Sequence, residues 1–148
     1  LSGCISNGVD IAAAIQMGAD YAYMGTRFIN TNESRADDGY REMIINSKAE
    51  DIVYTAAVSG VNANFLRPSL EAVGITQEMW KNTKKMYLGN ELDAAKEEAK
   101  AWKTIWSAGQ GVTAIDDSPS VQNLVSRLKK EFIHAIEKQM EMSSKFLD

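Results

Sequence analysis

Two turns of small residues, Gly3-Cys4-Ile5 and Met24-Gly25-Thr26, constrain the fold of this chain more than any other feature. The segment between them, Val9 to Met17, has apolar residues at three- and four-residue steps, which predicts a short amphipathic helix. Tyr21 to Met24 follows as a predicted strand, and residues 1 and 2 would end an earlier one. Because a strand usually needs about 5 residues to pair, we expect the first strand of this βαβ unit to begin before Leu1.

The two ends of the predicted helix carry signals of their own. Ser6 or Asn7 can accept hydrogen bonds from the first free amides, which predicts the N-cap at one of these positions. Gly18 suits the left-handed conformation that ends many helices. In a parallel βαβ unit the turns that follow both strands emerge on the same face, so we expect the two turns to lie close together.

The middle of the chain is predicted to be mainly helical. Ser34 to Lys48 has the apolar stripe of an amphipathic helix. Ile52-Val53-Tyr54 is β-branched and aromatic and favours an extended segment, whereas Ser59 to Pro68 has the Gly, Asn and Pro content of a loop. Two further helices are predicted, at Gln77 to Tyr87 and at Leu92 to Trp106.

The last part of the chain is a glycine-containing loop followed by a helix. Gly109 and Gly111 permit hinge motion, so the loop Ser107 to Gly111 is predicted to act as a lid. Ser118 is the predicted N-cap of the final helix, with Pro119 at its first position. The apolar stripe of this helix covers about five turns, enough to bury one side against a larger body. It consists of Val121, Leu124, Val125, Leu128, Phe132, Ile136 and Met140.

Length and charge limit the classes of function. The chain has 148 residues, whereas a complete (β/α)8 barrel needs roughly 250, so a barrel would include more than these residues. The net charge is -4 with acidic and basic residues interleaved, which argues against nucleic-acid and membrane partners. The single cysteine, Cys4, excludes an internal disulfide and is typical of a reducing compartment. We therefore expect a cytoplasmic protein without a bound metal, and the oligomeric state is not indicated.

The two turns have the composition of a phosphate-binding site. In parallel barrels the loops after the last two strands commonly hold a phosphate through backbone N–H groups. Small residues let the backbone approach the phosphate oxygens, and amides at turns carry partial positive charge, so no cluster of Lys or Arg is needed. Spacing alone also fits ordinary turn chemistry and a helix cap, and that alternative stays open at this point.

The segment Gly3 to Phe28 resembles the nitronate monooxygenase family. It contains Gly-Cys-Ile, Gly-Ala-Asp and Tyr-Met-Gly-Thr-Arg-Phe, where the family has Gly-Gly-Ile, Gly-Ala-Asp and Gln-Met-Gly-Thr-Arg-Phe. The resemblance continues through Ser59-Gly60, Ala63-Asn64 and Leu66-Arg67-Pro68, and again at Ser107 to Gly111. It implies an α/β fold, namely the C-terminal fragment of a TIM (β/α)8 barrel with its last βαβ unit, followed by a mostly helical cap.

The resemblance also implies a cofactor, FMN, and a site for it. The residues expected to bind FMN are Gly3, Cys4, Tyr23, Met24, Gly25 and Thr26. The Thr26 hydroxyl would add a donor to the backbone amides around the phosphate. Cys4 replaces the family's usual second Gly, which would strain the backbone if this position requires positive φ, and Tyr23 replaces a common Gln. A packing role is favoured for the Cys4 side chain, with a redox thiol as the alternative.

The activity implied by the resemblance is oxidation of alkyl nitronates with dioxygen, with the flavin accepting electrons. The family's histidine base is expected on an earlier strand, upstream of this chain, so these residues alone would not turn over. His134, the only histidine, lies off the apolar stripe of the last helix and is expected at the surface. Two roles are open for Arg27, steering of an anionic substrate or phosphate and pairing with a nearby carboxylate, and the pairing is favoured.

Two alternative functions remain at this stage. One is a flavin-dependent enoyl-acyl-carrier-protein reductase, a family that has similar phosphate loops. The other is a non-catalytic fragment or helical module.

Three regions are predicted along the chain. Residues 1–33 would be the end of the barrel and carry the FMN phosphate-binding loops. Residues 34–116 would form a helical or irregular cap and lid region. Residues 117–148 would form a C-terminal amphipathic helix that packs on the barrel.

Overall fold

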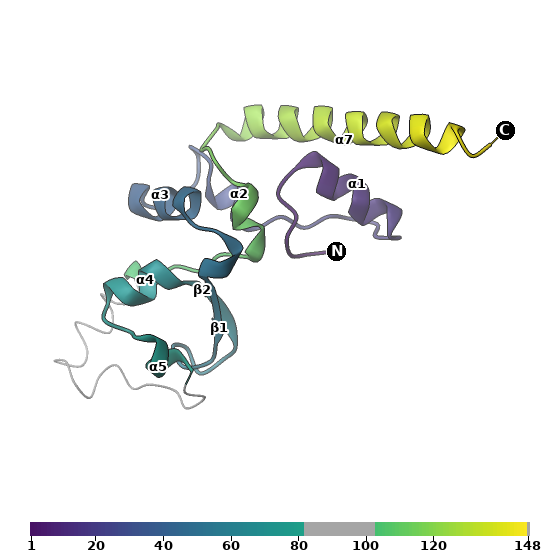
Figure 1. The fold of residues 1–148 in the computed structure, drawn as a ribbon. Helices are drawn as coiled ribbons and strands as arrows, with labels where there is room; N and C mark the ends of the chain where they lie inside the picture. Colours follow the sequence, from purple (N-terminus) through teal and green to yellow (C-terminus); the bar gives the residue numbers. More distant parts are fainter. Residues whose placement is uncertain (82–102, 148) are drawn as a thin grey trace.

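The computed structural model describes residues 1–81 and 103–147. The described chain is a mixed α/β structure with helices, short 3-10 turns and one small sheet. Its elements are α1 (Gly8–Gln16), α2 (Thr26–Ile29), α3 (Asp38–Asn46), η1 (Ala49–Asp51), β1 (Ile52–Thr55), β2 (Ala63–Leu66), α4 (Arg67–Ala72), α5 (Gln77–Trp80), η2 (Gln110–Ala114) and α7 (Val121–Ser144). Figure 1 shows α7 beside α1 at one end of the molecule, and the hairpin β1–β2 with α4 and α5 at the other.

The first helix forms where the sequence predicts it, one residue earlier at each end. Asn7 is the N-cap: its side chain accepts from the Asp10 amide at 2.8 Å, and the Asp10 carboxylate accepts from the Asn7 amide at 3.2 Å. This reciprocal pair satisfies amides that have no partner within the helix. Gly18 has φ +91, which confirms the left-handed position predicted at the end of the helix.

The strand predicted from Tyr21 to Met24 does not form. Its parallel pairing is reduced to one bridge, between Ser2 and Tyr23, with the Tyr23 amide donating to the Leu1 carbonyl oxygen at 2.8 Å. A ladder requires several paired residues, and residues 1 and 2 are the only neighbours that pair with this segment in the described chain. The parallel direction of the bridge and the helix between its two residues agree with the predicted βαβ order.

The predicted loop at Ser59 to Pro68 is wrong in part, because its second half forms β2 and the start of α4. β1 and β2 pair antiparallel, with Ile52 opposite Leu66 and Thr55 opposite Ala63. The intervening turn contains Gly60 at φ +79. Composition pointed to a loop because Gly60 and the asparagines are typical of turns, but the pairing with β1 makes the following residues extended.

Two hydrophobic clusters form the core of the part of the molecule that contains α3, the hairpin β1–β2, α4 and α5. The first consists of Ile44 of α3, Leu66 of β2, Val112 of η2, and Ala108 and Ile115, which lie just outside η2. The second lies under the hairpin, α4 and α5: Val58, Phe65, Leu70, Ile75 and Ile105. Leu66 and Phe65 are successive residues of β2 that belong to different clusters, as expected when side chains alternate across a strand.

The helix predicted over Ser34 to Lys48 is shorter in the structure and begins only at Asp38. Its predicted apolar stripe is confirmed, with Ile44 fully buried and Tyr40 packed against the first cluster. The Tyr40 ring stacks on Trp106 with centroids 5.0 Å apart, and the Tyr40 hydroxyl donates to the Ser107 carbonyl oxygen. Burial raises the pKa of Tyr40, and the hydrogen bond to Ser107 opposes that shift only in part.

The last helix starts later than predicted. Ser120, not Ser118, is the N-cap, and it accepts from the Asn123 amide at 3.2 Å. Ser118 instead accepts from the Asn30 side chain at 2.9 Å. Because Ser118 binds Asn30, it does not cap the helix, and α7 begins at Val121, two residues later than predicted.

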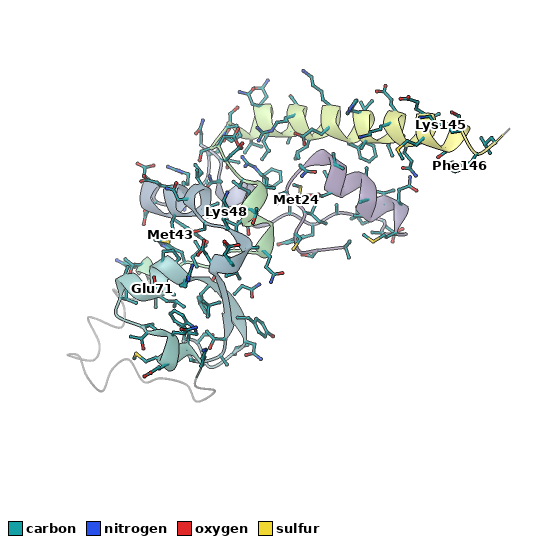
Figure 2. The ribbon with its side chains drawn as sticks, viewed as in Figure 1. Met24, Met43, Lys48, Glu71, Lys145 and Phe146 are labelled. Carbon is teal, nitrogen blue, oxygen red and sulfur yellow. The ribbon has the colours of Figure 1, made fainter. Side chains whose placement is uncertain are left out.

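The predicted apolar stripe of α7 is buried only in its first half. Leu124 and Leu128 are buried, whereas Met140 is 67% exposed. Figure 2 shows Lys145 and Phe146 at the far end of α7, beyond the end of α1. The C-terminal turns of α7 therefore lie free of the described part of the chain.

Two predicted helices fall partly outside the described residues. Of Gln77 to Tyr87, the structure describes α5 and Lys81. Of Leu92 to Trp106, residues 92–102 lie outside the described residues, and Trp106 is in an irregular segment where its carbonyl oxygen accepts from the Leu66 amide at 2.8 Å. Among the helices that the structure describes, none is long and apolar enough to cross a bilayer.

Candidate functional site

The two predicted turns meet at a small cavity of about 160 Å³. Its lining consists of Ser2, Gly3, Cys4, Ile5, Ser6, Tyr23, Gly25, Thr26, Gly109 and Gly111. The volume is several times the roughly 30 Å³ share of one water molecule in the liquid, so a group larger than water can enter. No lysine, arginine or carboxylate of the described chain lines this cavity, so an anion there would depend on backbone amides and hydroxyl groups.

Five of the six residues predicted to bind FMN line this cavity, and Met24 does not. Met24 lines a larger apolar cavity of about 430 Å³ between α1, α7 and the segment that joins α1 to α2. Figure 2 labels Met24 near α1, beneath the long helix. Tyr23 lies on the side of the small cavity and is 71% exposed. The two side chains therefore diverge, as expected for neighbours in an extended segment.

The first turn has an uncommon backbone conformation. Gly3 has φ +92 and Cys4 has φ +56, so both residues are left-handed. Among the described residues Cys4 is the only non-glycine with positive φ. Cys4 therefore has the backbone strain expected for a non-glycine residue with positive φ. The Cys4 thiol is exposed and lies 4.0 Å from the Gln110 side-chain oxygen.

The second turn presents a hydroxyl group with a defined orientation. Thr26 Oγ1 accepts a hydrogen bond from the Gly109 amide at 2.8 Å. A hydroxyl has one proton to donate besides the oxygen that accepts. With its oxygen engaged by Gly109, the Thr26 hydroxyl can donate its proton to a group in the cavity.

Gly25 leaves space in the wall of the cavity. A Cβ built on Gly25 meets no atom within 4 Å, and its φ of -99 is accessible to any residue. The absence of a side chain is therefore not required by the fold at this position. It keeps the backbone open to an approaching ligand, which is a common reason for glycine in phosphate-binding turns.

A third wall comes from the loop at Gly109 and Gly111, about a hundred residues further along the chain. The Ser6 hydroxyl donates to the Gly111 carbonyl oxygen at 2.8 Å. A Cβ on Gly111 would lie 2.5 Å from Ser6 Oγ and 3.1 Å from Cys4 Cα. The sequence predicts a hinged lid near the mouth of an active site at this loop, but it does not predict the contacts with Ser6 and Thr26. The only signal in the sequence was the pair of glycines, which fits hinges and close packing equally well.

Arg27, next to Thr26, points away from the cavity and is buried. It is 1% exposed and its Nη2 lies 2.9 Å from Asp117 Oδ1, which confirms the predicted pairing with a carboxylate. Arg127 binds the same carboxylate at 2.7 and 3.0 Å. The hydrogen bonds from Arg127 lower the pKa of Asp117, and Asp117 in turn raises the pKa of Arg127. The pKa of Arg27 is lowered, because the effect of burial exceeds the opposing effect of Asp117.

The histidine and tryptophan side chains that the structure describes do not line this cavity. His134 is on the exposed side of α7, as predicted. Trp80 and Trp106 pack against the hydrophobic clusters, and Trp102 lies outside the described residues. Within residues 1–81 and 103–147 no group of His, Cys, Asp or Glu has the arrangement of a metal site.

Comparison with known proteins assigns the chain to a family. The sequence model of the nitronate monooxygenase family matches residues 2–131. The chain therefore belongs to the nitronate monooxygenase family, whose members are flavin-dependent oxidoreductases. A nitronate monooxygenase of Paraburkholderia phytofirmans is 31% identical over 151 residues, which cover 97% of this chain and 40% of that protein. A probable nitronate monooxygenase of Staphylococcus aureus is 42% identical over 59 residues, covering 40% of this chain and 17% of that protein.

Solved structures agree with this assignment. FabK from Thermotoga maritima has a TM-score of 0.72 at 28% identity, covering 95% of this chain and 46% of that chain. Nitroalkane oxidase from Streptomyces ansochromogenes has a TM-score of 0.67 at 26% identity, covering 93% of this chain and 40% of that chain. These neighbours are TIM-barrel flavoenzymes. The chain thus spans less than half the length of each of these relatives.

Proposed function

We propose that this chain forms the FMN phosphate-binding part of a flavoenzyme that oxidises alkyl nitronates with dioxygen. The observation that carries the proposal is the meeting of two turns and a distant loop around one small cavity. Five residues that the family resemblance predicts for FMN line it. Membership of a family of flavin-dependent oxidoreductases supplies the reaction class.

The residues around the cavity fit a phosphate group. Left-handed Gly3 and Cys4 turn the backbone sharply, which is the kind of conformation that directs successive amides toward one anion. Thr26 adds a hydroxyl donor whose oxygen is held by Gly109. Gly25 leaves room for the ligand to approach the backbone. When bound, the flavin would accept the electrons of the reaction, while this chain binds and orients its phosphate end.

We further propose that residues 1–33 are the end of a (β/α)8 barrel, residues 34–116 a cap and lid region, and residues 117–148 a helix that packs on the barrel. Support comes from the parallel bridge between Ser2 and Tyr23, with α1 between them, and from the similarity to TIM-barrel structures. In this arrangement the catalytic base belongs to another part of the enzyme, because His134 lies exposed on α7. A cytoplasmic location stays a prediction.

The phosphate site is tested by filling the space at Gly25. In the natural protein that carries this sequence, Gly25→Val should weaken FMN binding by about tenfold or more, as expected when a group enters the ligand's space and phosphate hydrogen bonds are lost. Riboflavin, which lacks the phosphate, should bind about equally to both proteins. Ala13→Val, on the exposed face of α1, is the matched control because it adds a similar side chain away from the cavity. Equal weakening of FMN and riboflavin by Gly25→Val would contradict a phosphate at this turn.

The reaction is tested with the same natural protein. Oxygen consumption that depends on an alkyl nitronate is the expected result. Turnover only with a nicotinamide cofactor and an enoyl thioester would instead identify an enoyl-acyl-carrier-protein reductase. A protein that purifies without flavin and fails to bind added FMN would favour the non-catalytic alternative.

A further inference from the structure

A chain of polar contacts runs behind the cavity, on the side away from the ligand space. It starts at Arg27, whose Nη2 donates to Asp117 Oδ1 at 2.9 Å, to the Asp117 carbonyl oxygen at 3.1 Å and to the Asn30 carbonyl oxygen at 3.3 Å. Arg27 Nε and Nη1 have no partner among the described residues. Asp117 is therefore the only carboxylate that pairs with this buried cation in the described chain.

The same carboxylate connects Arg27 to the last helix. Arg127, in the second turn of α7, donates to both oxygens of Asp117, at 2.7 and 3.0 Å. Arg127 Nε lies 3.9 Å from Glu131 Oε1, and Glu131 Oε2 accepts from the Gly8 amide at 2.7 Å. The contacts therefore run from Arg27 through Asp117, Arg127 and Glu131 to the first residue of α1.

These contacts join the two turns of the cavity from behind. Arg27 directly follows Thr26 in the second turn, and Gly8 stands two residues after Ser6 at the end of the first turn. From the other side, Gly109 binds Thr26 and Gly111 binds Ser6. The two turns are thus linked twice, once by the loop that lines the cavity and once by the ion pairs behind it.

We propose that Asp117 is a positioning residue for the phosphate site, which holds the Gly25–Thr26 turn at a fixed distance from the Gly3–Ser6 turn through Arg27 and Arg127. The inference rests on the proposed function and adds a residue outside the cavity to it. Asp117 is not part of the cavity lining, so its effect on a ligand passes through Arg27. Without its carboxylate the buried Arg27 loses its counter-ion, and the ion-pair link from Arg27 through Asp117 to Arg127 of α7 is lost.

The test compares FMN with riboflavin in the natural protein and in Asp117→Asn. The FMN dissociation constant should rise by about tenfold, the lower end of what loss of an outer hydrogen-bonding partner costs at metal sites. Riboflavin binding should not change, because only the phosphate end meets the displaced turn. A purely structural role of Asp117 would weaken both flavins together.

Two further variants make the test specific. Asp51→Asn is the matched control, because Asp51 pairs with Arg67 and neither residue lines the cavity. It should leave the affinity ratio, the affinity for FMN divided by the affinity for riboflavin, unchanged. Arg127→Gln should lower the same affinity ratio while the Arg27–Asp117 pair stays in place. Arg127→Lys keeps the positive charge, so its affinity ratio should lie between those of Arg127→Gln and the natural protein. If Asp117→Asn fails to fold, the decision rests on the Arg127 pair of variants.

The outcomes separate this inference from the proposed function. An unmodified protein that binds FMN no better than riboflavin would overturn the phosphate site itself. An unmodified protein that prefers FMN, together with an unchanged affinity ratio in folded Asp117→Asn, or in Arg127→Gln where Asp117→Asn does not fold, would overturn only the positioning role. A lowered affinity ratio in folded Asp117→Asn, or in Arg127→Gln where Asp117→Asn does not fold, supports the positioning role when Asp51→Asn is unaffected.

Discussion

Cys4 occupies a backbone conformation that glycine adopts more readily than any other residue. Its φ of +56 follows Gly3 at φ +92, so the chain makes two left-handed steps in succession. The thiol side chain is exposed and makes one long contact, with Gln110. The backbone, more than the side chain, therefore decides what a substitution does here.

We expect Cys4→Gly to raise the free energy of unfolding by roughly 0.5–1 kcal/mol, because release of about 1–2 kcal/mol of left-handed strain exceeds the backbone entropy cost of glycine. Urea denaturation of the natural protein and the variant measures the difference. Ala13→Gly in α1 is the control: there glycine should lower stability by about 1 kcal/mol, because no positive φ is relieved. A loss of stability in Cys4→Gly equal to that in Ala13→Gly would contradict strain at Cys4.

Gly111 is fixed by close packing and not by its own backbone angles. An added methyl group would lie 2.5 Å from Ser6 Oγ and 3.2 Å from the Cys4 carbonyl carbon. We expect Gly111→Ala to lower stability by about 1–3 kcal/mol and to weaken FMN binding, because it pushes the loop away from the first turn. Gly109→Ala should have a small effect on stability, since its Cβ would make an ordinary contact of 3.4 Å with Thr26. Thermal unfolding of the two variants distinguishes them, and equal melting temperatures would rule out the packing role of Gly111.

At the scale of elements, the contact between α1 and α7 depends on one glycine. A Cβ on Gly8 would overlap the Leu128 carbonyl oxygen and the Phe132 amide nitrogen, and would lie 2.5 Å from Glu131 Cβ. Two of these three atoms belong to the backbone of α7, which cannot rotate away. The helices cross here at a separation that only glycine permits.

Gly8→Ala should therefore lower the free energy of unfolding by about 3 kcal/mol, the upper end of the usual cost of overpacking. It should also increase hydrogen exchange at the start of α7. Gly25→Ala is a suitable control, because a Cβ there meets no atom within 4 Å. Unchanged exchange in α7 of the Gly8 variant would show that the two helices do not pack so closely in solution.

The start of α7 shows how tertiary contacts change a local signal. Ser118 and Pro119 have the residue types of a helix start, yet Asn30 binds Ser118 and the helix begins after Ser120. The Glu33 carboxylate accepts a hydrogen bond at 2.9 Å from the amide of Val121, the first residue of the helix, which has no partner within the helix. Both partners come from a part of the chain about ninety residues earlier, which no local pattern could reveal.

At the scale of the whole molecule, Asp117 links the segment after α1 to the C-terminal helix, and this link should respond to acid. Hydrogen bonds from Arg127 hold the pKa of Asp117 below its ordinary value in the folded state. A depressed carboxyl pKa stabilises the fold above the unfolded value of about 3.9 and loses that effect as the pH falls toward the folded pKa. The difference in stability between the natural protein and Asp117→Asn should therefore be constant above about pH 5 and shrink below about pH 4.

Denaturant unfolding at a series of pH values from neutral to acid measures this difference. A difference that stays constant down to about pH 2 would mean that the Asp117 carboxylate is not paired in the folded protein. His134→Gln is a useful control, because His134 is exposed on α7 and takes no part in the contacts of Asp117.

The sequence by itself determined the features that depend on near neighbours. Asn7 and Gly18 mark the ends of α1 through a cap and a left-handed residue, and both signals lie within one turn of the helix. The two turns at Gly3 and Gly25 were also predictable, because glycine and other small residues are typical of tight turns. Family membership followed from the same short segments.

Only the tertiary structure decided which distant segments complete the site. Gly109 and Gly111 join the two turns, and Asp117 pairs with Arg27, across separations of about a hundred residues. The strand β2 was missed for the same reason, since its extended form depends on pairing with β1. Caps and periodicity are local and leave a trace in the order of residues, whereas packing between distant segments depends on where the folded chain brings them together.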